Sequence, residues 1–373
     1  MKNILLFCGG KSAEHEISIR SAKSILNVLD RKKYNVLIVG ISRSGTWHLI
    51  DEGQLANTTS IEYAESSVCG LLNHKDGAYL VMPDKQTKID FALGVLHGTY
   101  GEDGTIQGLL EMYNLPYFGS NVLATAIAMD KDKLRRLIGG QSIPMVEYLA
   151  ITKFKEITYQ EVCASLKANT LFVKPNALGS SIGVQKVRNE TDFKQAVSYA
   201  FTFDDVVLVE RAVSSPRELE CAIMGDQDDL LASAIGEIIP NYDFYSYEAK
   251  YLDPNGADLV IPARIDSALK LRIQDYSKAI FKAIGCSGLA RVDFLLSDSN
   301  ELFFNEINSL PGFTSISMYP KLMEVSGISY PELVDRLIEY GFKAHARKNK
   351  LKLWPDEIDA FEAKKNKGIV ANL

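Results

Sequence analysis

The stretch LARVDFLLSDSNELFFNEINSLPGFT, residues 289–314, decides the fold of this chain. Two apolar runs, VDFLL and LFFNEI, are typical of adjacent buried strands joined by the turn SDSN. Charged and amide side chains nevertheless lie in or beside these runs: Arg291, Asp293, Glu306 and Asn308. Because burying an unpaired carboxylate is very costly, these groups must face a partner.

The spacing of these polar residues predicts a metal site. Glu306 and Asn308 are two residues apart, so in a strand they share one face, and Asp293 on the preceding strand can lie across from them. Two carboxylates and an amide oxygen, without His or Cys, suit a hard cation such as Mg²⁺ better than Zn²⁺. Arg291 falls on the same face and can stabilise an anion beside the metal. The alternative is a structural cluster in which Arg291 pairs with the acids.

Composition limits the class of protein. A chain of 373 residues with 46% hydrophobic residues is expected to form two or three domains of a soluble protein. With 41 Lys and Arg against 47 Asp and Glu, the net charge of −6 argues against nucleic-acid binding. Five scattered cysteines form no zinc pattern, which favours reduced thiols in the cytoplasm. No apolar run reaches the roughly 18 residues of a membrane span, and the N-terminus is typical of a first strand rather than a signal peptide.

Strands and helices alternate in the first third of the chain. The expected strands are residues 3–8, 34–41 and 90–96, and the expected helices are residues 17–29 and 105–113. Continuous apolar strands in such an alternation predict a parallel α/β sheet. This first domain is expected to span residues 1–125, with an irregular strand and loop insert at 45–88.

Two further units are expected. Residues 126–215 carry short, closely connected elements, which favour an α+β unit: helices at 130–139 and 191–200, and strands at 171–174, 182–187 and 206–210. Residues 216–342 begin with the strand ELECAIM and end with the strand pair quoted above, separated by a polar, Tyr-rich loop at 240–262. The charged tail 343–373 is expected to be a solvated helix or a frayed end.

Two loops follow expected parallel strands, where ligands of α/β sheets bind. The loop GGKS is not a P-loop, because Leu5 occupies the position of the first glycine, and no GxGxxG follows the strand. GGKSAEHEIS can still present Glu14 to a cleft, unless Glu14 only stabilises a helix N-terminus. HGTYGEDGT, residues 97–105, similarly presents His97, for which a purely structural role is the alternative.

The stretch LFVKPNALGSSIGVQKV is typical of a phosphate-binding hairpin. Lys174 ends one strand, and the loop that follows offers backbone N–H groups and hydroxyls at Gly179, Ser180 and Ser181. A mobile surface hairpin is the alternative interpretation.

Seven segments together resemble the D-alanine–D-alanine ligases of the ATP-grasp superfamily: GGKSAEHEIS, LHGTYGEDGTIQG, MDK, VKPNALGSSIGV, YSYEAKY, RVDF and NEINSLPGFT. They occur in the family's order and cover most of residues 1–340. Leu178 and Ser246 depart from commoner members, but neither is assigned to catalysis. The resemblance implies an ATP-grasp fold, in which the N-terminal α/β domain precedes two α+β subdomains that grip ATP.

The resemblance also implies an activity and its residues. The enzyme would join two D-alanine molecules through D-alanyl phosphate for peptidoglycan synthesis, using two Mg²⁺ (or Mn²⁺) held by Asp293, Glu306 and Asn308, with Glu306 bridging. The residues implied to bind ATP are Lys131, Lys174, Gly179, Ser180, Ser181, Glu210, Arg211, Val213, Glu218, Phe244, Lys250 and Asn305. The residues implied to bind or activate D-alanine are Glu14, His97, Ser180, Lys250, Tyr251, Arg291, Gly312, Ser317 and Met318.

The roles that the family implies for these residues follow from their charge. Lysines and metal would offset repulsion when the first carboxylate attacks the γ-phosphate, and Arg291 with the Gly312 N–H would stabilise the later oxyanion. Glu14 would anchor the first ammonium group and orient Ser180. Ser317 and Met318 would hold the second carboxylate, and loop 240–262 would exclude water. Two candidates stay open for the general base that deprotonates the second amine. One is a pair formed by Ser180 and Tyr251, and the other is the phosphate itself.

Tyr251, in YEAKY, resembles the dipeptide-forming members, although it can also simply pack on its loop. The nearest alternative function is therefore a D-alanine–D-lactate ligase. A more remote one is a non-catalytic amino-acid or nucleotide-binding protein on the same fold. The family implies D-alanine and ATP as ligands and a homodimer formed through the N-terminal domain.

Overall fold

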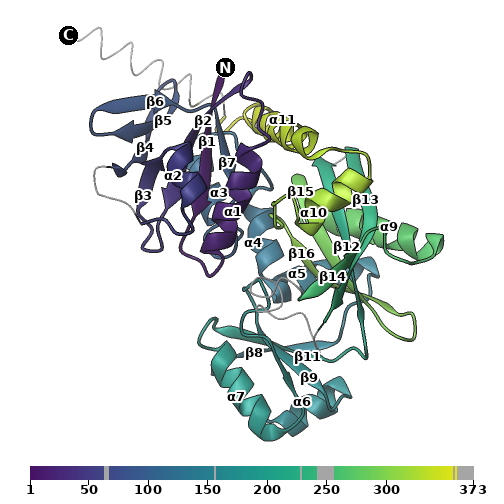
Figure 1. Cartoon of the computed structure of the whole chain (residues 1–373). Coiled ribbons are helices and arrows are strands. Elements are labelled where there is room, and N and C mark those ends of the chain that lie inside the picture. The colour runs from purple at the N-terminus through teal and green to yellow at the C-terminus, as the bar shows by residue number, and fades with distance from the viewer. Residues whose placement is uncertain (63–66, 155–156, 227–228, 242–255, 356–357, 359–373) are drawn as a thin grey trace.

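The N-terminal unit is built around a mostly parallel sheet. The computed structural model describes residues 1–62, 67–154, 157–226, 229–241, 256–355 and 358 (Figure 1). The sheet order is β3 (Trp47–Ile50), β2 (Tyr34–Ile41), β1 (Lys2–Gly9) and β7 (Phe91–Gly94). β1 pairs in parallel with β2 and β7, and β3 is an antiparallel edge. The predicted α/β sheet is therefore confirmed.

Helices and an insert complete this unit. The helices are α1 (His15–Leu26), α2 (Glu52–Asn57) and α3 (Thr105–Met112). α1 begins two residues before the predicted 17–29 segment and ends three residues before its end. The insert at 45–88 is more regular than predicted, because besides β3 and α2 it holds an antiparallel sheet of β4 (Gly70–His74), β5 (Gly77–Met82) and β6 (Lys85–Lys88). The strands β4 and β6 are short and largely exposed and give little apolar signal, whereas β5 carries an apolar run.

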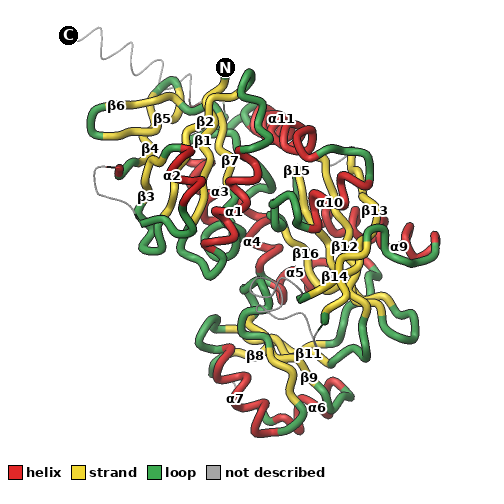
Figure 2. The backbone as a smooth tube through the Cα atoms, viewed as in Figure 1, coloured by secondary structure: helices red, strands yellow, loops and turns green. Residues whose placement is uncertain are grey.

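A second, antiparallel sheet has the order β10 (Gln185–Val187), β9 (Leu171–Pro175), β11 (Val206–Arg211) and β8 (Tyr148–Thr152). Helices α6 (Tyr159–Leu166) and α7 (Glu190–Ala200) cover one face, where Val173, Val207 and Val209 join their core. Figure 2 shows these helices on the side away from the third sheet. Because strand residues alternate between faces, Lys174 and Glu210 belong to the opposite face.

The third sheet is antiparallel and covered on both faces. Its order is β14 (Ala257–Val260), β13 (Asp229–Pro240), β12 (Arg217–Asp226), β15 (Gly288–Leu296) and β16 (Leu302–Asn308). One face packs against α9 (Ser267–Ala283), α4 (Val122–Met129) and α5 (Lys131–Ile138), and the other against α10 (Met318–Val325) and α11 (Tyr330–Lys348). α5 thus shares the core of this sheet, although the sequence grouped it with residues 126–215. The domain limits near 125 and 215 stay predictions.

α11 connects the N-terminal unit to the third sheet. The two units share one continuous core, in which Ile4 and Leu6 belong with Leu337 and Ile338 of α11. Gly341 permits the close approach of α11, because a Cβ there would lie 2.3 Å from the Tyr117 carbonyl oxygen.

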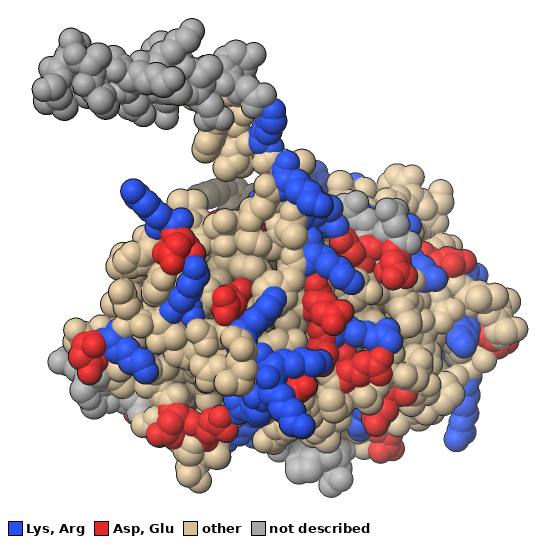
Figure 3. Space-filling view, turned by 90° about the horizontal axis from the view of Figure 1, so that it is seen from above, with Lys and Arg blue, Asp and Glu red and all other residues tan. Residues whose placement is uncertain are grey.

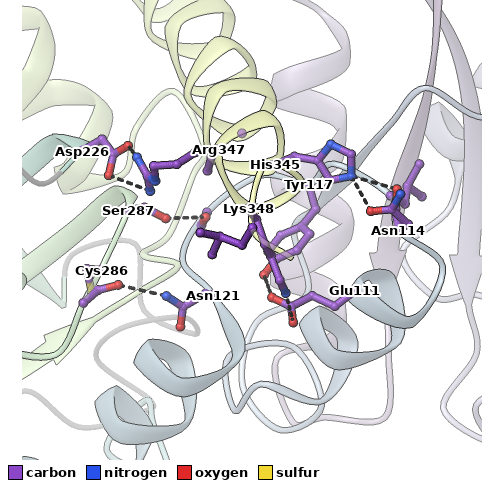
Figure 4. A pocket seen from close by; sticks show the side chains of 16 residues that line it. Glu111, Asn114, Tyr117, Asn121, Asp226, Cys286, Ser287, His345, Arg347 and Lys348 are labelled. Atoms are coloured by element: carbon purple, nitrogen blue, oxygen red, sulfur yellow. Dashed lines mark hydrogen bonds and ion pairs between the residues drawn. The ribbon is translucent and has the colours of Figure 1, made fainter. Parts of the chain in front are cut away.

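The last turns of α11 add two polar contacts to the N-terminal unit and one to β12 of the third sheet (Figure 4). Lys348 Nζ lies 2.6 Å from Glu111, His345 Nε2 lies 2.9 Å from the Asn114 carbonyl oxygen, and Arg347 pairs with Asp226. They border a hollow of about 350 Å³. The predicted tail helix exists as far as Lys348, and most of the remaining tail lies outside the described residues.

All five cysteines are free; Cys8, Cys221 and Cys286 are buried, and Cys69 and Cys163 are half-buried. Within the described ranges, no helix has the length and apolar character that crossing a membrane requires. Seen from above, Lys and Arg side chains lie beside Asp and Glu side chains over the same surface (Figure 3). This mixture is in keeping with the modest net charge of −6.

Candidate active site

The charged residues of the quoted stretch lie together at one end of a face of the third sheet. Asp293 pairs with Glu306 across β15 and β16, and with Glu220 across β12 and β15. Arg291 pairs with Asn308 in the same ladder. Farther along this face the residues become apolar and are covered by α10 and α11, while the charged end stays half-buried. The predicted placement of Asp293 opposite Glu306 is confirmed.

Arg291 is paired with two carboxylates on this face. Its Nε and Nη2 atoms donate to the two oxygens of Asp293, each at 2.7 Å, and Nε lies 2.9 Å from Glu220 Oε2. Asn308 Nδ2 donates to Asp293 Oδ2 at 3.0 Å. This is the ion-pair arrangement that the sequence left as an alternative, and Glu220 is a member that sequence reasoning missed.

The donor atoms on this face fit a hard cation. Asp293, Glu306 and Asn308 offer only oxygen ligands, which Mg²⁺ prefers. Across the described ranges, no group of three or more His, Cys, Asp and Glu side chains is arranged to hold a metal. Asp293, Glu306 and Asn308 would supply only part of the octahedral ligand set of Mg²⁺, which the ion usually completes with water and substrate phosphates.

Lys131 connects the charged face to the predicted phosphate-binding hairpin. It is buried at the N-terminus of α5, where the Asp130 side chain caps the helix. Its Nζ donates to the Leu178 carbonyl oxygen at 2.8 Å and lies 3.5 Å from Glu306 Oε2. Lys131 therefore places a positive charge between the Glu306 carboxylate of β16 and the hairpin loop.

Lys174 belongs to a buried charge cluster on the second sheet. Its Nζ lies 2.6 Å from Glu210 Oε1, and Arg135 Nη1 approaches the same oxygen at 2.8 Å. Burial lowers the pKa of Lys174 to about 8; Arg135 and Lys131 act in the same direction, and Glu210 opposes them. Burial works to raise the pKa of Glu210, but Arg135 and Lys174 outweigh it and hold that pKa below its usual value. The Glu210 carboxylate is thus engaged by cations, and Arg135 is a further residue that sequence reasoning missed.

The hairpin loop contacts the N-terminal unit through Ser180. Ser180 Oγ donates to Glu14 Oε1 at 2.5 Å, and Glu14 is only 8% exposed. Gly98 makes room for this carboxylate, because a Cβ there would lie 2.8 Å from Glu14 Oε2, and its φ of +74° suits glycine. Ser180 and Ser181 both adopt left-handed backbone conformations with φ of 57°. Three segments far apart in sequence therefore meet at Glu14.

His97 lies buried beside Glu14, and both ring nitrogens have protein partners. Nε2 lies 2.9 Å from Ser21 Oγ, and Nδ1 lies 3.3 Å from Glu102 Oε1. Burial alone would lower the pKa of His97, but the hydrogen bond and charge of Glu102, with the charge of Glu14, raise it overall. The structural role that the sequence left open is thus present, and Glu102 is another partner that the sequence did not single out.

The loop after β16 leads into α10. Ser317 Oγ lies 2.8 Å from Thr314 Oγ1 and accepts from the Thr314 N–H at 3.1 Å, while Met318 is buried as the first residue of α10. Gly312 is half-buried in the same loop. Gly312, predicted to contact the oxyanion, and Ser317 and Met318, predicted to hold the second carboxylate, therefore lie within one short segment next to the charged face.

The remaining predicted residues fall into two groups. Arg211 pairs with Glu147 and lies over the Phe303 ring at 5.1 Å, and Asn305 accepts from Arg135 at 3.4 Å. Glu218 and Val213 are half-buried at the start of β12 and just before it. The other group lies outside the described residues: Phe244, Lys250 and Tyr251, with most of loop 240–262.

Comparison with known proteins is consistent over both halves of the chain. A family model described as D-ala D-ala ligase N-terminus matches residues 3–120, and one described as D-ala D-ala ligase C-terminus matches residues 137–339. A D-alanine–D-alanine ligase of Shouchella clausii is 42% identical over 360 residues, covering 94% of this chain and 97% of that protein.

Solved structures agree. The D-alanine–D-alanine ligase from Coxiella burnetii superposes with a TM-score of 0.81 at 35% identity, covering 97% of this chain and 100% of that one. The D-alanine–D-alanine ligase from Bacillus anthracis complexed with ATP superposes with a TM-score of 0.71 at 28% identity, covering 93% of this chain and 100% of that one.

Proposed function

The chain belongs to the D-alanine–D-alanine ligase family of ATP-dependent enzymes, and we propose that the residues between its second and third sheets join two D-alanine molecules through D-alanyl phosphate. One observation carries this assignment of roles. Lys131 contacts both the hairpin loop and Glu306, so the groups suited to phosphate and those suited to a cation converge on one site. Peptidoglycan synthesis is the process that such a ligase serves.

The first step needs positive charge. A carboxylate oxygen of the first D-alanine attacks the γ-phosphorus of ATP, the bond to the β-phosphate oxygen breaks, and ADP leaves. Lys131 and Lys174 reduce the repulsion between the two anions and take up charge in the transferring group. Asp293, Glu306 and Asn308 would hold Mg²⁺, which when bound supplies further neutralisation of the phosphate oxygens.

The N-terminal unit would hold the first D-alanine. Glu14 is the buried carboxylate that can receive its ammonium group, and the bond from Ser180 fixes the direction of that carboxylate. His97 lies beside it, where the charges of Glu102 and Glu14 raise its pKa, and the protonated ring would balance these two carboxylates. Binding the substrate between fixed groups reduces the entropy lost in reaching the transition state.

In the second step the amine of the second D-alanine attacks the acyl carbon, and phosphate leaves. The tetrahedral intermediate carries an oxyanion, for which Arg291 Nη1 and the Gly312 N–H are the proposed donors. The contacts of Arg291 with Asp293 and Glu220 support this role, because through Nε and Nη2 they fix the plane of the guanidinium group. Ser317 and Met318, in the same loop as Gly312, are the proposed contacts of the second carboxylate.

A phosphate-release assay tests the reaction. Purified full-length protein with Mg-ATP is expected to release phosphate with D-alanine and to form the dipeptide, but not with L-alanine. An absence of D-alanine-dependent phosphate release would favour the non-catalytic alternative. To test for a depsipeptide ligase, D-alanine alone is compared with D-alanine plus D-lactate at neutral pH. Product that forms only with D-lactate would contradict the dipeptide assignment.

Two further properties rest on the family alone. We propose a homodimer formed through the N-terminal domain and a cytoplasmic location. Light scattering on the eluting protein separates a dimer from a monomer of 41.3 kDa. A monomer at micromolar concentration would contradict the proposed assembly.

A further inference from the structure

We propose that Arg135 is a positioning residue for ATP: it holds Glu210 and Lys174 in place at the phosphate site and connects the two sheets that enclose the nucleotide. This inference rests on the proposed role of Lys174. Arg135 itself touches no reacting atom in this proposal, because its guanidinium is directed to protein groups.

The contacts of Arg135 join both sheets. It is 1% exposed and lies one helical turn after Lys131 on α5, so both cations share a helix face. Nη1 lies 2.8 Å from Glu210 Oε1 of β11, and Nη2 donates to the Asn305 carbonyl oxygen of β16 at 3.4 Å. The guanidinium also lies over the Tyr148 ring of β8, 5.0 Å from its centroid. One side chain thus contacts two strands of the second sheet and one of the third.

The charge of the cluster points to an anionic ligand. Lys131, Arg135 and Lys174 bring three cations to one part of the site, where Arg135 and Lys174 share Glu210 Oε1 and Lys131 lies 3.5 Å from Glu306. Buried cations that share a carboxylate are stabilised by a further anion. An arginine cannot relieve this crowding of positive charge by losing a proton, whereas a lysine can. The polyphosphate of ATP is the anion that the proposed function supplies.

Arg135 also sets how Lys174 can be used. Glu210 Oε1 receives both cations, at 2.6 Å from Lys174 and 2.8 Å from Arg135. Without Arg135, Glu210 would no longer share its charge between two cations and would attract Lys174 more strongly. The attraction of Lys174 for phosphate would then be weaker. With Arg135 present, the carboxylate is shared, so Lys174 is oriented without being neutralised.

The pH profile of ATP binding provides a readout that a merely structural role would not move. The groups that face Lys174 are Glu210 from β11 and Lys131 and Arg135 from α5, with Glu306 of β16 acting through Lys131. Burial, Arg135 and Lys131 lower the pKa of Lys174 to about 8. Lys174 is therefore charged below about pH 8, and its attraction for phosphate falls as the pH rises through that value. Removing the charge of Arg135 raises this pKa, so the fall moves to higher pH.

The experiment measures Kd for Mg-ATP by isothermal titration calorimetry from pH 6.5 to 9.5. It compares the full-length wild type with Arg135→Met, Arg135→Lys and Arg136→Met. The last is a matched control, because Arg136 is the adjacent helix residue but is exposed and pairs with Asp132 at 2.9 Å. For Arg135→Met we expect Kd at pH 7 to rise about tenfold or more, since a unit charge acts strongly at a buried site. In this variant, the loss of affinity for Mg-ATP at alkaline pH should also move to higher pH.

Arg135→Lys should restore most of the affinity, and Arg136→Met should match the wild type. A wild-type Kd and pH profile for Arg135→Met would overturn the proposal, as would an equal effect of Arg136→Met. If Arg135→Met fails to fold, Glu210→Gln decides in its place, and an unchanged affinity and pH profile in that variant would overturn the proposal. Lys174→Met separates the two levels of inference: unaltered ATP binding there would contradict the role of Lys174 itself.

Discussion

The contact between Ser180 and Glu14 provides a quantitative test of how the hairpin and the N-terminal unit cooperate. Ser180 Oγ donates to the buried Glu14 carboxylate at 2.5 Å. A hydrogen bond to a charged group contributes roughly 1.5–3 kcal/mol. If the bond forms the site for the first D-alanine, Ser180→Ala should lower kcat/KM for D-alanine by the corresponding factor, about 10- to 150-fold.

The backbone at this position allows a control. Ser180 has φ of 57°, a conformation that glycine adopts without strain, so Ser180→Gly removes the hydroxyl and favours the observed backbone. If the lost hydrogen bond is responsible, the alanine and glycine variants should lose similar activity. If only backbone conformation matters, the glycine variant should retain it. Kd for ATP should change less than kcat/KM for D-alanine in both variants.

A double-mutant cycle with Glu14→Gln completes the test. The glutamine keeps an oxygen that can accept from Ser180 but removes the charge, so its effect alone measures the loss of the ammonium partner. Since the two side chains are in contact, their effects should not add. Additive losses, or a Ser180→Ala variant within twofold of the wild type, would refute the reasoning from this contact.

Three further predictions concern other parts of the molecule. Glu306→Gln should nearly abolish turnover without lowering the melting temperature, and chelation by EDTA should stop phosphate release until Mg²⁺ or Mn²⁺ is restored; near-normal kcat in the variant would show that the metal assignment is wrong. Gly341→Ala should destabilise the protein by roughly 1–3 kcal/mol in urea unfolding, since a Cβ there has no room, while Gly140→Ala, where nothing lies within 4 Å of the added Cβ, should not. Tyr319→Phe should cost about 1 kcal/mol, because it leaves the buried Ile223 carbonyl oxygen without the hydroxyl donor now 3.0 Å away; an unchanged urea midpoint would argue against that bond.

The sequence predicted those parts of the fold that carry a strong apolar signal. Continuous apolar runs located β1, β2, β15 and β16, and the two-residue spacing of Glu306 and Asn308 placed them on one face opposite Asp293. In the insert, β4 and β6 have short sequences with little apolar signal, and the apolar run of β5 alone did not reveal a three-stranded sheet. The packing of α5 on the third sheet also escaped, because contacts between distant segments leave little trace in local pattern.

Arg135 and Glu220 could not be predicted for a related reason. In KDKLRRLI an arginine beside a second arginine is typical of a solvated helix face, and only the fold buries Arg135 while leaving Arg136 exposed. Glu220 falls within an apolar strand like Glu306, but no neighbour in sequence indicates that Arg291 lies across from it. A charged residue within a run of buried residues indicates that the residue has a partner, but the sequence does not identify that partner.

The shared core and polar contacts of α11 have a mechanical consequence. The N-terminal unit and the third sheet are joined by one hydrophobic core, whereas the second sheet has a core of its own. The second sheet meets its neighbours partly through polar contacts such as those of Ser180 and Lys131. We therefore expect the molecule to behave as two rigid bodies rather than three. Exchange of ADP for ATP then requires rotation of the second sheet alone, which carries Ser180 away from Glu14, while the N-terminal unit and the third sheet keep a fixed spacing on the other sides of the amino-acid site.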